Sequence, residues 1–504
     1  MTMPMPPSSR RPGPRLAFAG AALASACALL SSGCAVGPDF VRPAPPEADR
    51  YTREPPAATT ASADGLAQRF APGAELRADW WRLFQSPPLD AAVQQALEHS
   101  PTLLAAEASL RQSQDNLRAG AGVFYPQFDA GLGGGRARSA PIQQGSPQPG
   151  TIFNVVTLSG SISYALDVFG GERRAVEGLG ALVDVQRFTG KAAVLALSAN
   201  VVDTCIARAA YAAQIRATEQ LIALETEQLH SIEVQVRAGT APYANLLSQR
   251  SLLAANRALL APLRQRLSQA EHLLALLEGE LPARATPPDI ELDSLTLPVD
   301  LPVSVPSELV RQRPDILAAE AQLHAASANI GVATAAMYPS FSLGADYGTA
   351  GSSVANLFGP TGRFWSIGPS ITAPLFRGGS LRAERQAAID AFDVQQANYR
   401  QTVLAAFDQV ADALQALEHD AQALQAQTEA RGAAADALAL LQANYRAGLV
   451  AYVDVLTADA QYHQATLAWV QAVAQRQQDT VALFAALGGG WWNAPAAGAE
   501  GKMP

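Results

Sequence analysis

Two segments of the chain alternate between apolar residues and small or polar ones. In 341–347 every second residue is apolar, with serine, glycine and aspartate between, and 365–373 repeats this pattern. The segment 158–166 follows it more loosely. A two-residue period places the apolar side chains on one face of a β-strand. Segments of about ten such residues are typical of strands that cross an outer membrane, although a half-buried soluble sheet has the same period.

Aromatic residues stand near the ends of these segments, where the two surfaces of a membrane collect amphipathic rings. They are Tyr125, Phe169, Tyr338, Phe364, Trp365 and Phe376. The glycine-rich run 131–135 suits a further strand whose small residues face a crowded interior. Together with the export signal at the start of the chain, these features favour membrane strands over a soluble sheet.

Most of the remaining sequence is rich in alanine, leucine and glutamine and predicts helices. We predict two long helices, over 172–237 and 381–446, each of about 66 residues or about 100 Å. The medium helices are 241–278 and 450–487, and the short ones are 89–118 and 307–335. A medium and a short helix together nearly equal a long one, so two stacked helices could lie alongside each long helix. Helices of this length predict rods or a coiled coil.

The chain contains an internal duplication. Three groups of residues recur about 210 positions later, which is the signature of a repeated unit. The matching pairs are Pro101–Leu110 with Pro314–Leu323, Tyr125–Phe128 with Tyr338–Phe341, and Arg237–Gly239 with Arg446–Gly448. Each copy holds two predicted strands, which gives four strands per chain. Because closed membrane barrels begin at about eight strands, the functional unit must be an oligomer.

The chain begins with a targeting segment. Three arginines, the last of them Arg15, precede an apolar run from Leu16 to Leu30 that is too short to span a bilayer. Small residues then lead to Cys34 in a sequence similar to a lipobox, so we expect cleavage before Cys34 and acylation of that cysteine. Cys27 is a rival site. The alternative is that Cys34 is an ordinary residue near a signal-peptide cleavage site.

These observations divide the chain into six parts. They are a signal peptide (1–33), a lipidated extended segment (34–79), the first repeat (80–280), a proline-rich linker (281–306), the second repeat (307–487) and a C-terminal tail (488–504). No apolar stretch after the leader reaches the ~20 residues of a membrane helix. Any membrane crossing should therefore use strands.

Composition and charge exclude several classes of function. The 504 residues carry a formal net charge of −9, and loss of the leader, with its three arginines, moves this to about −12, which argues against a nucleic-acid partner. Of the cysteines only Cys205 would remain as a free thiol, so no disulfide is expected.

Catalytic chemistry has no support in the sequence. The six histidines are dispersed without a His-x-x-x-His spacing, and we interpret them as lying on solvated helix faces: His99, His230, His272, His324, His419 and His463. The run 131–135 lacks the lysine and hydroxyl residue of a phosphate loop. We therefore expect no enzyme activity, metal or cofactor.

Several motifs together resemble one known family, the TolC-like outer-membrane factors, and within it the NodT-type lipoproteins that serve resistance-nodulation-division efflux pumps. The motifs are Gly33–Phe40, Trp80–Phe84, the two Tyr-Pro pairs, Tyr445–Gly448 with Tyr452–Leu456, and Ala486–Trp492. The resemblance implies an α+β membrane protein. Three chains would form a 12-stranded outer-membrane β-barrel, four strands from each, continued by a long periplasmic α-helical barrel.

The resemblance also implies roles for residues at the two Arg-Ala-Gly turns. Arg237, Gly239, Arg446 and Gly448 would form the periplasmic tip that docks an adaptor protein. Tyr445 and Asp454 match residues of the family's periplasmic gate. A second gate aspartate is Asn245 here and a gate arginine is Val450, so a weaker or rearranged latch is expected.

Three copies of Asp454 around a narrow axis would form an acidic ring that attracts cations. The alternative is an Asp454 that is merely solvated on a helix surface.

The resemblance implies a homotrimer in the outer membrane, anchored by lipid and extending into the periplasm. It would pass small toxic compounds passively from an inner-membrane pump and its adaptor to the exterior. Two alternatives stay open: an exit channel for type I protein secretion, and a periplasmic coiled-coil structural lipoprotein without a pore.

Overall fold

The computed structural model describes residues 35–54, 57–140, 145 and 149–493. The leader, both proposed lipidation sites and most of the C-terminal tail lie outside these residues. The described chain forms two compact units. Unit 1 comprises 35–42, Gln112–Val183 and Ala321–Ala397, and unit 2 comprises Pro43–Arg111, Asp184–Glu320 and 398–493.

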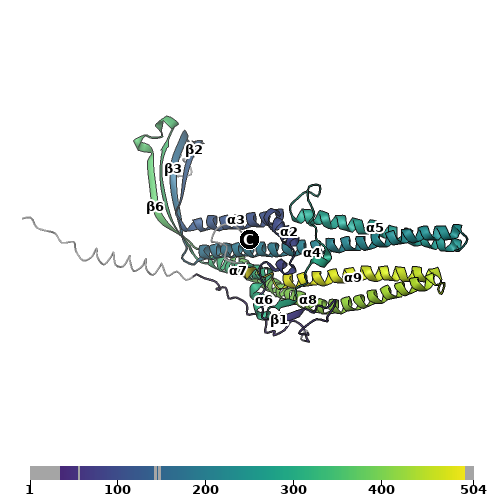
Figure 1. The fold of residues 1–504 in the computed structure, drawn as a ribbon. Coiled ribbons are helices and arrows are strands. Elements are labelled where there is room, and N and C mark those ends of the chain that lie inside the picture. The colour runs from purple at the N-terminus through teal and green to yellow at the C-terminus, as the bar shows by residue number, and fades with distance from the viewer. Residues whose placement is uncertain (1–34, 55–56, 141–144, 146–148, 494–504) are drawn as a thin grey trace, which may run out of the picture. The chain divides into compact units, whose positions relative to one another are not determined.

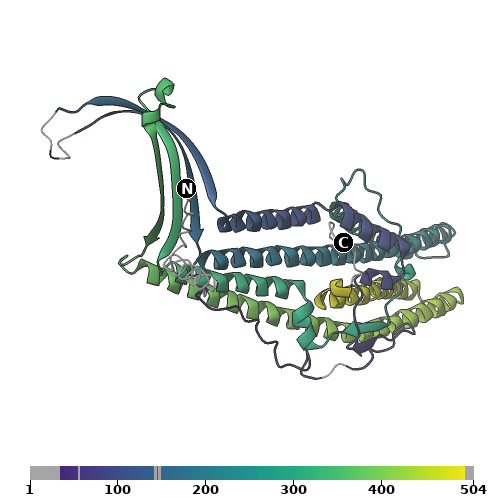
Figure 2. The same cartoon turned by 90° about the vertical axis from the view of Figure 1, so that its left-hand side faces the viewer.

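Unit 1 contains a four-stranded antiparallel sheet, with two strands from each repeat. Its strands are β2 (Gln127–Arg138), β3 (Ile152–Leu166), β5 (Ser340–Gly351) and β6 (Arg363–Thr372). They lie side by side in the order β2-β3-β5-β6 (Figures 1 and 2). The four predicted strands are therefore confirmed, including the glycine-rich strand β2.

The register of the sheet separates its side chains into an apolar face and a polar face. On one face Tyr347 lies opposite Trp365, and Ala345 lies between Ile162 and Ile367. The opposite face carries one row of polar residues across all four strands: Asp129, Ser161, Asp346 and Ser366. Within this row the Ser366 hydroxyl donates a hydrogen bond of 3.1 Å to Asp346. The two-residue period thus gives a sheet with one apolar face and one polar face.

Two pairs of matched helices account for most of the remaining chain. The long helices α4 (Gly171–Arg237) and α8 (Ser380–Arg446) have 67 residues each, and α5 (Tyr243–Leu277) and α9 (Tyr452–Ala486) have 35 each. All eight ends lie within about two residues of the predicted ones. Equal lengths in the two copies confirm that the repeats share one architecture.

The two short helices of the prediction are each divided in the structure. The segment 89–118 forms α2 (Pro87–His99) and α3 (Pro101–Ala121), and 307–335 forms α6 (Pro306–Gln312) and α7 (Pro314–Ala335). The dividing residues, Ser100 and Arg313, have extended ψ angles of 122° and 125°. Each precedes a proline, whose ring disfavours the helical conformation of the residue before it. The repeated Pro101 and Pro314 therefore start new helices.

The N-terminal segment and the linker are more regular than predicted. Strand β1 (Arg69–Pro72) pairs in parallel with β4 (Asp300–Val303), so the segment 34–79 and the linker 281–306 meet in a two-stranded sheet. Nearby, a 3-10 helix at Trp80–Phe84 buries both of its terminal rings. The sequence predicts no strand in either segment, because the linker is rich in proline and has no periodic pattern; each observed strand has only four residues and includes a proline.

Unit 2 has a large apolar core. The core gathers Trp80, Phe84, Val201, Leu414 and Phe484 with residues of the linker. The thiol of Cys205 is buried in the same core and is free, and burial raises the pKa of this thiol to about 12. The N-terminal segment, the linker and the helices thus share one interior.

Residues 36–40 are fixed on unit 1 by backbone contacts. The Val36 N–H donates a hydrogen bond of 3.0 Å to the Phe169 carbonyl. Gly37 has a φ of +98°, and a Cβ at this position would come within 2.5 Å of the Gly331 Cα. Only glycine fits this approach, which brings the segment against α7.

Side chains hold the same segment. Asp39 pairs with Arg174 at 2.5 Å, and Phe40 stacks on His324 with 4.4 Å between ring centroids. His324 in turn lies 2.9 Å from Glu177, whose pKa is lowered by its hydrogen bonds to His324 and Arg174 in spite of an opposing effect of partial burial. The expectation that His324 lies on a solvated helix face is wrong, because Phe40 covers its ring.

Among the described helices, α4 alone contains an 18-residue window that is apolar enough for a membrane span by length and composition. Half of that window is buried within the chain. The sequence prediction concerned apolar stretches of ~20 residues, so this 18-residue window does not contradict it. A helix packed in the interior of a protein is buried in the same way.

Candidate functional site at the ends of the helical hairpins

The two Arg-Ala-Gly sequences form matching turns between the paired helices of unit 2. Gly239 joins α4 to α5 with a φ of +72°, and Gly448 joins α8 to α9 with a φ of +74°. In both turns the glycine N–H bonds to the carbonyl three residues earlier, and the next N–H bonds to the carbonyl five residues before it. This is the Schellman pattern, which favours glycine because its central residue is left-handed.

Gly448→Ala should weaken the second turn by about 1–2 kcal/mol, the cost of a left-handed alanine. No atom lies within 4 Å of the position of an added Cβ, so backbone strain is the whole effect. Hydrogen exchange of the last turn of α8 should become faster. Ala447→Ser at the preceding exposed position is the matched control, and equal exchange in both variants would contradict this account.

The arginines of the two turns are exposed and have different surroundings. Arg237 donates from its Nε to the Glu233 carbonyl at 3.2 Å, which holds it along α4. Arg446 borders a groove between the hairpins. These positions leave both guanidinium groups accessible at the end of unit 2.

The three predicted gate residues lie at the ends of the helices that flank the turns, and within the described chain no hydrogen bond joins them to one another. Asp454 is exposed and caps α9, because its carboxylate accepts a hydrogen bond of 3.0 Å from the Ala451 N–H. Asn245 has the same place at the start of α5. The ring of Tyr445 packs against that of Tyr452 at a tilt of 54°, with 5.2 Å between centroids. Within one chain Asp454 thus has a structural role as a helix cap.

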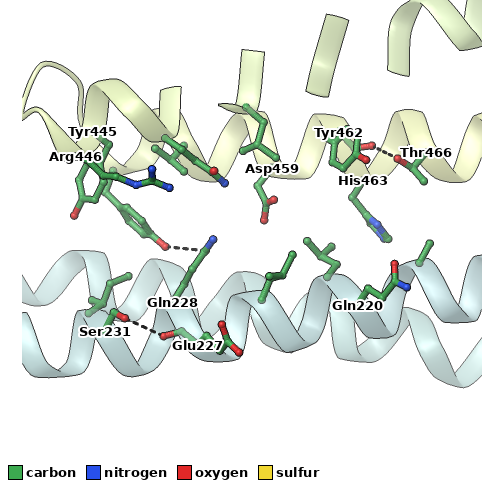
Figure 3. A pocket seen from close by; sticks show the side chains of 18 of the residues that line it. Gln220, Glu227, Gln228, Ser231, Tyr445, Arg446, Asp459, Tyr462, His463 and Thr466 are labelled. Atoms are coloured by element: carbon green, nitrogen blue, oxygen red, sulfur yellow. Dashed lines mark hydrogen bonds between the residues drawn. The ribbon is translucent and has the colours of Figure 1, made fainter. Parts of the chain in front are cut away.

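A groove of about 660 Å³ separates the two hairpins and is lined by α4, α8 and α9 (Figure 3). Its apolar floor near the turns includes Ile232 and Val455, which pack with Leu246 and Leu456. Farther from the turns its lining becomes polar. Figure 3 shows Asp459 and His463 directed from α9 toward α4.

Behind this groove the hairpins are joined by buried polar side chains. The Tyr452 hydroxyl donates to Gln249 at 2.6 Å, and Gln249 donates to the Glu225 carbonyl at 3.1 Å. Burial raises the pKa of Tyr452, which keeps the hydroxyl a donor. This chain of contacts connects α9, α5 and α4, so the two repeats are tied together through hydrogen bonds.

Two carboxyl groups in this region titrate far above their usual range. Burial raises the pKa of Glu225 to about 7, with Asp459 adding to the shift and the Asn256 amide, 2.6 Å away, opposing it. Burial also raises the pKa of Asp459 to about 6 and lowers that of His463. The expectation that His463 lies on a solvated face is wrong: the residue is buried.

Sequence reasoning missed these buried polar residues, although a signal existed. A spacing of three and four residues places one set of side chains on a single face of the helix: Tyr452, Leu456, Asp459 and His463. The same spacing places Glu225 on one face with Leu229 and Ile232. A polar residue on an apolar stripe is a candidate for burial with a partner.

Comparisons with known proteins match this architecture. The family described as "Outer membrane efflux protein" matches residues 92–280 and 305–489. The pyoverdine export outer membrane protein OpmQ of Pseudomonas putida strain KT2440 is 31% identical over 419 residues, which are 82% of this chain and 88% of that protein. The probable efflux pump outer membrane protein TtgC of the same strain is 28% identical, with coverage of 90% and 92%.

Among solved structures, the outer-membrane channel OprN superimposes with a TM-score of 0.81 at 27% identity, covering 91% of this chain and all of that chain. The duplicated sheet and hairpins thus define a TolC-like fold, that of outer-membrane channels of efflux systems. The chain belongs to the outer membrane efflux protein family. It is the outer-membrane component of a tripartite efflux system and is not an enzyme.

Proposed function

We propose that three copies of this chain close into one channel that conducts small compounds to the exterior. The edges of the four-stranded sheet carry this proposal. Strands β2 and β6 each pair on one side only within the described chain, which leaves 12- and 10-residue edges. In a bilayer such edges must be paired, since lipid offers no hydrogen bonds. Pairing β6 of one copy with β2 of the next gives twelve strands.

The two faces of the sheet indicate which side of the closed barrel would face lipid and which would face the interior. The apolar face with Trp365 and Ile367 suits lipid, and the row of Asp129, Ser161, Asp346 and Ser366 suits a water-filled interior. Each chain would contribute two carboxylates at one level of the pore. Cations should therefore be favoured over anions along this part of the path.

We further propose that Cys34 is acylated and anchors the chain to outer-membrane lipid, and that unit 2 extends into the periplasm. The exposed turns at Arg237, Gly239, Arg446 and Gly448 would dock a periplasmic adaptor, which connects the channel to an inner-membrane pump. Exposure of both arginines and the matched turns support this role. The cargo class follows the relatives, whose names refer to pyoverdine export and efflux.

The conducting trimer is tested with the purified full chain in planar bilayers. We expect a trimer in detergent and discrete, cation-selective channels that need all three copies. A monomeric protein without conductance would refute the proposal.

Asp454→Ala should change the gating of this channel and lower its cation selectivity, because three mutually repelling carboxylates near the closed end would be lost. It should also weaken the start of α9 by about 1 kcal/mol, the usual value of a cap. Asn245→Ala changes the equivalent uncharged position and serves as the control. Unchanged gating and selectivity in Asp454→Ala would leave that residue a helix cap only.

A further inference from the structure

Three buried side chains near the groove between the hairpins carry polar atoms without a hydrogen-bond partner among the described residues. The atoms are Glu225 Oε2, Asp459 Oδ2 and His463 Nε2. Their residues are 0%, 6% and 7% exposed. Leaving a buried polar atom unpaired costs about 1–3 kcal/mol. Three such atoms in one place indicate that something absent from the isolated chain completes their bonding.

Two of these residues face the groove together. Asp459 and His463 lie one helical turn apart on α9, on the same face, and both line the groove. Figure 3 shows their side chains entering the space between α9 and α4, with Gln220 on the opposite wall. The volume of about 660 Å³ is in the range of small-molecule sites.

The lining of the groove selects for a positive charge. Asp459 offers a carboxylate, and His463 is neutral because burial lowers its pKa, so its free Nε2 can accept. The ring of Tyr462 offers a π face, which attracts cations. Among the described lining residues Arg446 is the only guanidinium, and it belongs to the turn end of the groove. Acceptors and an aromatic ring therefore dominate the inner end.

We propose that this groove is a binding site for a small organic cation with a primary ammonium group. The ammonium would donate hydrogen bonds to the free oxygen of Asp459 and to His463 Nε2, and the apolar part of the ligand would lie along Leu221 and Leu224 of α4. The proposal does not depend on the trimer being a channel.

Binding at this site should release protons. In the empty groove Glu225 and Asp459 titrate with pKa values of about 7 and about 6. An ammonium group beside Asp459 favours the charged form of that carboxyl and lowers its pKa, and its positive charge acts in the same direction on Glu225, which interacts with Asp459. Between about pH 6 and 7 part of the carboxyl population therefore loses its protons when the ligand binds. A ligand held only by apolar contacts would cause no such release.

Calorimetry with 2-phenylethylammonium on the detergent-solubilised full chain tests the proposal. We expect saturable binding whose heat at pH 6.5 depends on the buffer, as proton release requires. The neutral analogue 2-phenylethanol should not compete. Asp459→Asn and His463→Gln should each weaken binding about tenfold or more, the value of a charge-assisted hydrogen bond. Asp436→Asn, at an exposed position of α8 outside the groove, should bind normally.

Two results would overturn the proposal. Binding of the alcohol as strong as that of the ammonium, or an unaltered affinity in Asp459→Asn, would overturn the proposal. Circular dichroism and thermal unfolding of each variant distinguish loss of binding from loss of fold. An Nα-acetyl-lysine amide probe separates the two sources of this chemistry: tighter binding of that probe assigns the groove to a lysine of a docked protein, and tighter binding of the aryl amine assigns it to a free amine.

Discussion

Ile367→Arg is expected to abolish insertion of the sheet into the outer membrane. Ile367 is 67% exposed in the single chain and lies in the middle of β6, on the apolar face beside Ala345. An arginine on the lipid face costs about 2–4 kcal/mol near the bilayer centre, and a trimer would carry three of them. Outer-membrane fractionation and the amount of trimer in detergent measure the loss.

The neighbouring residue supplies a closely matched control. Ser366→Arg places the same side chain one position earlier, on the polar face, where Ser366 bonds to the Asp346 carboxylate. This variant should insert and form trimers, with reduced cation selectivity because the arginine neutralises Asp346. If the two variants insert equally well, the assignment of the apolar face to lipid is wrong.

Arg476→Met should destabilise unit 2 by about 3 kcal/mol or more, because three buried acceptors would each lose their donor at about 1–3 kcal/mol apiece. Arg476 is 2% exposed on α9, and burial lowers its pKa. Its guanidinium donates to Gln68 at 3.1 Å and to both Thr60 and the Leu66 carbonyl at 3.3 Å. Methionine fills much of the volume but leaves these acceptors in the interior without a donor.

Thermal unfolding and limited proteolysis measure this effect, with the segment around Thr60 to Gln68 expected to become the first site of cleavage. Arg69→Met is the control: its ion pair with Asp300 is solvent-exposed, so its loss should cost at most about 1 kcal/mol. Equal midpoints for the two variants would show that Arg476 does not hold the N-terminal segment.

The parts of the fold that followed from the sequence are those determined by local residues. Glycines stand at the ends of the long helices, and a two-residue period fixes the strands. The break before Pro101 was missed because the helical pattern continues across it, whereas the geometry of the residue before proline decides it. Strands β1 and β4 were missed because their partners are more than 200 residues apart in the chain.

The candidate site was only partly predictable for a similar reason. The turn glycines could be located from the repeat, since a left-handed residue must end each helix there. His463 was interpreted as a solvated residue because of its polarity, and no prediction was made for Asp459. Their position on the face that carries Leu456 decides their burial, and the groove they line depends on helices from both repeats. The lipidation prediction for Cys34 stays a prediction.

Because residues 36–40 are fixed on unit 1, the proposed acyl anchor would also fix the position of the sheet along the membrane normal. Cys34 stands two positions before Val36, so the chain between them spans at most about 7 Å. Val36 is bonded to the backbone of Phe169, whose ring stacks on Tyr338 with 4.7 Å between centroids at the ends of the strands. An acyl chain on Cys34 and this aromatic pair would therefore report the same level of the bilayer. The lipid would set the height of the pore instead of tethering it loosely.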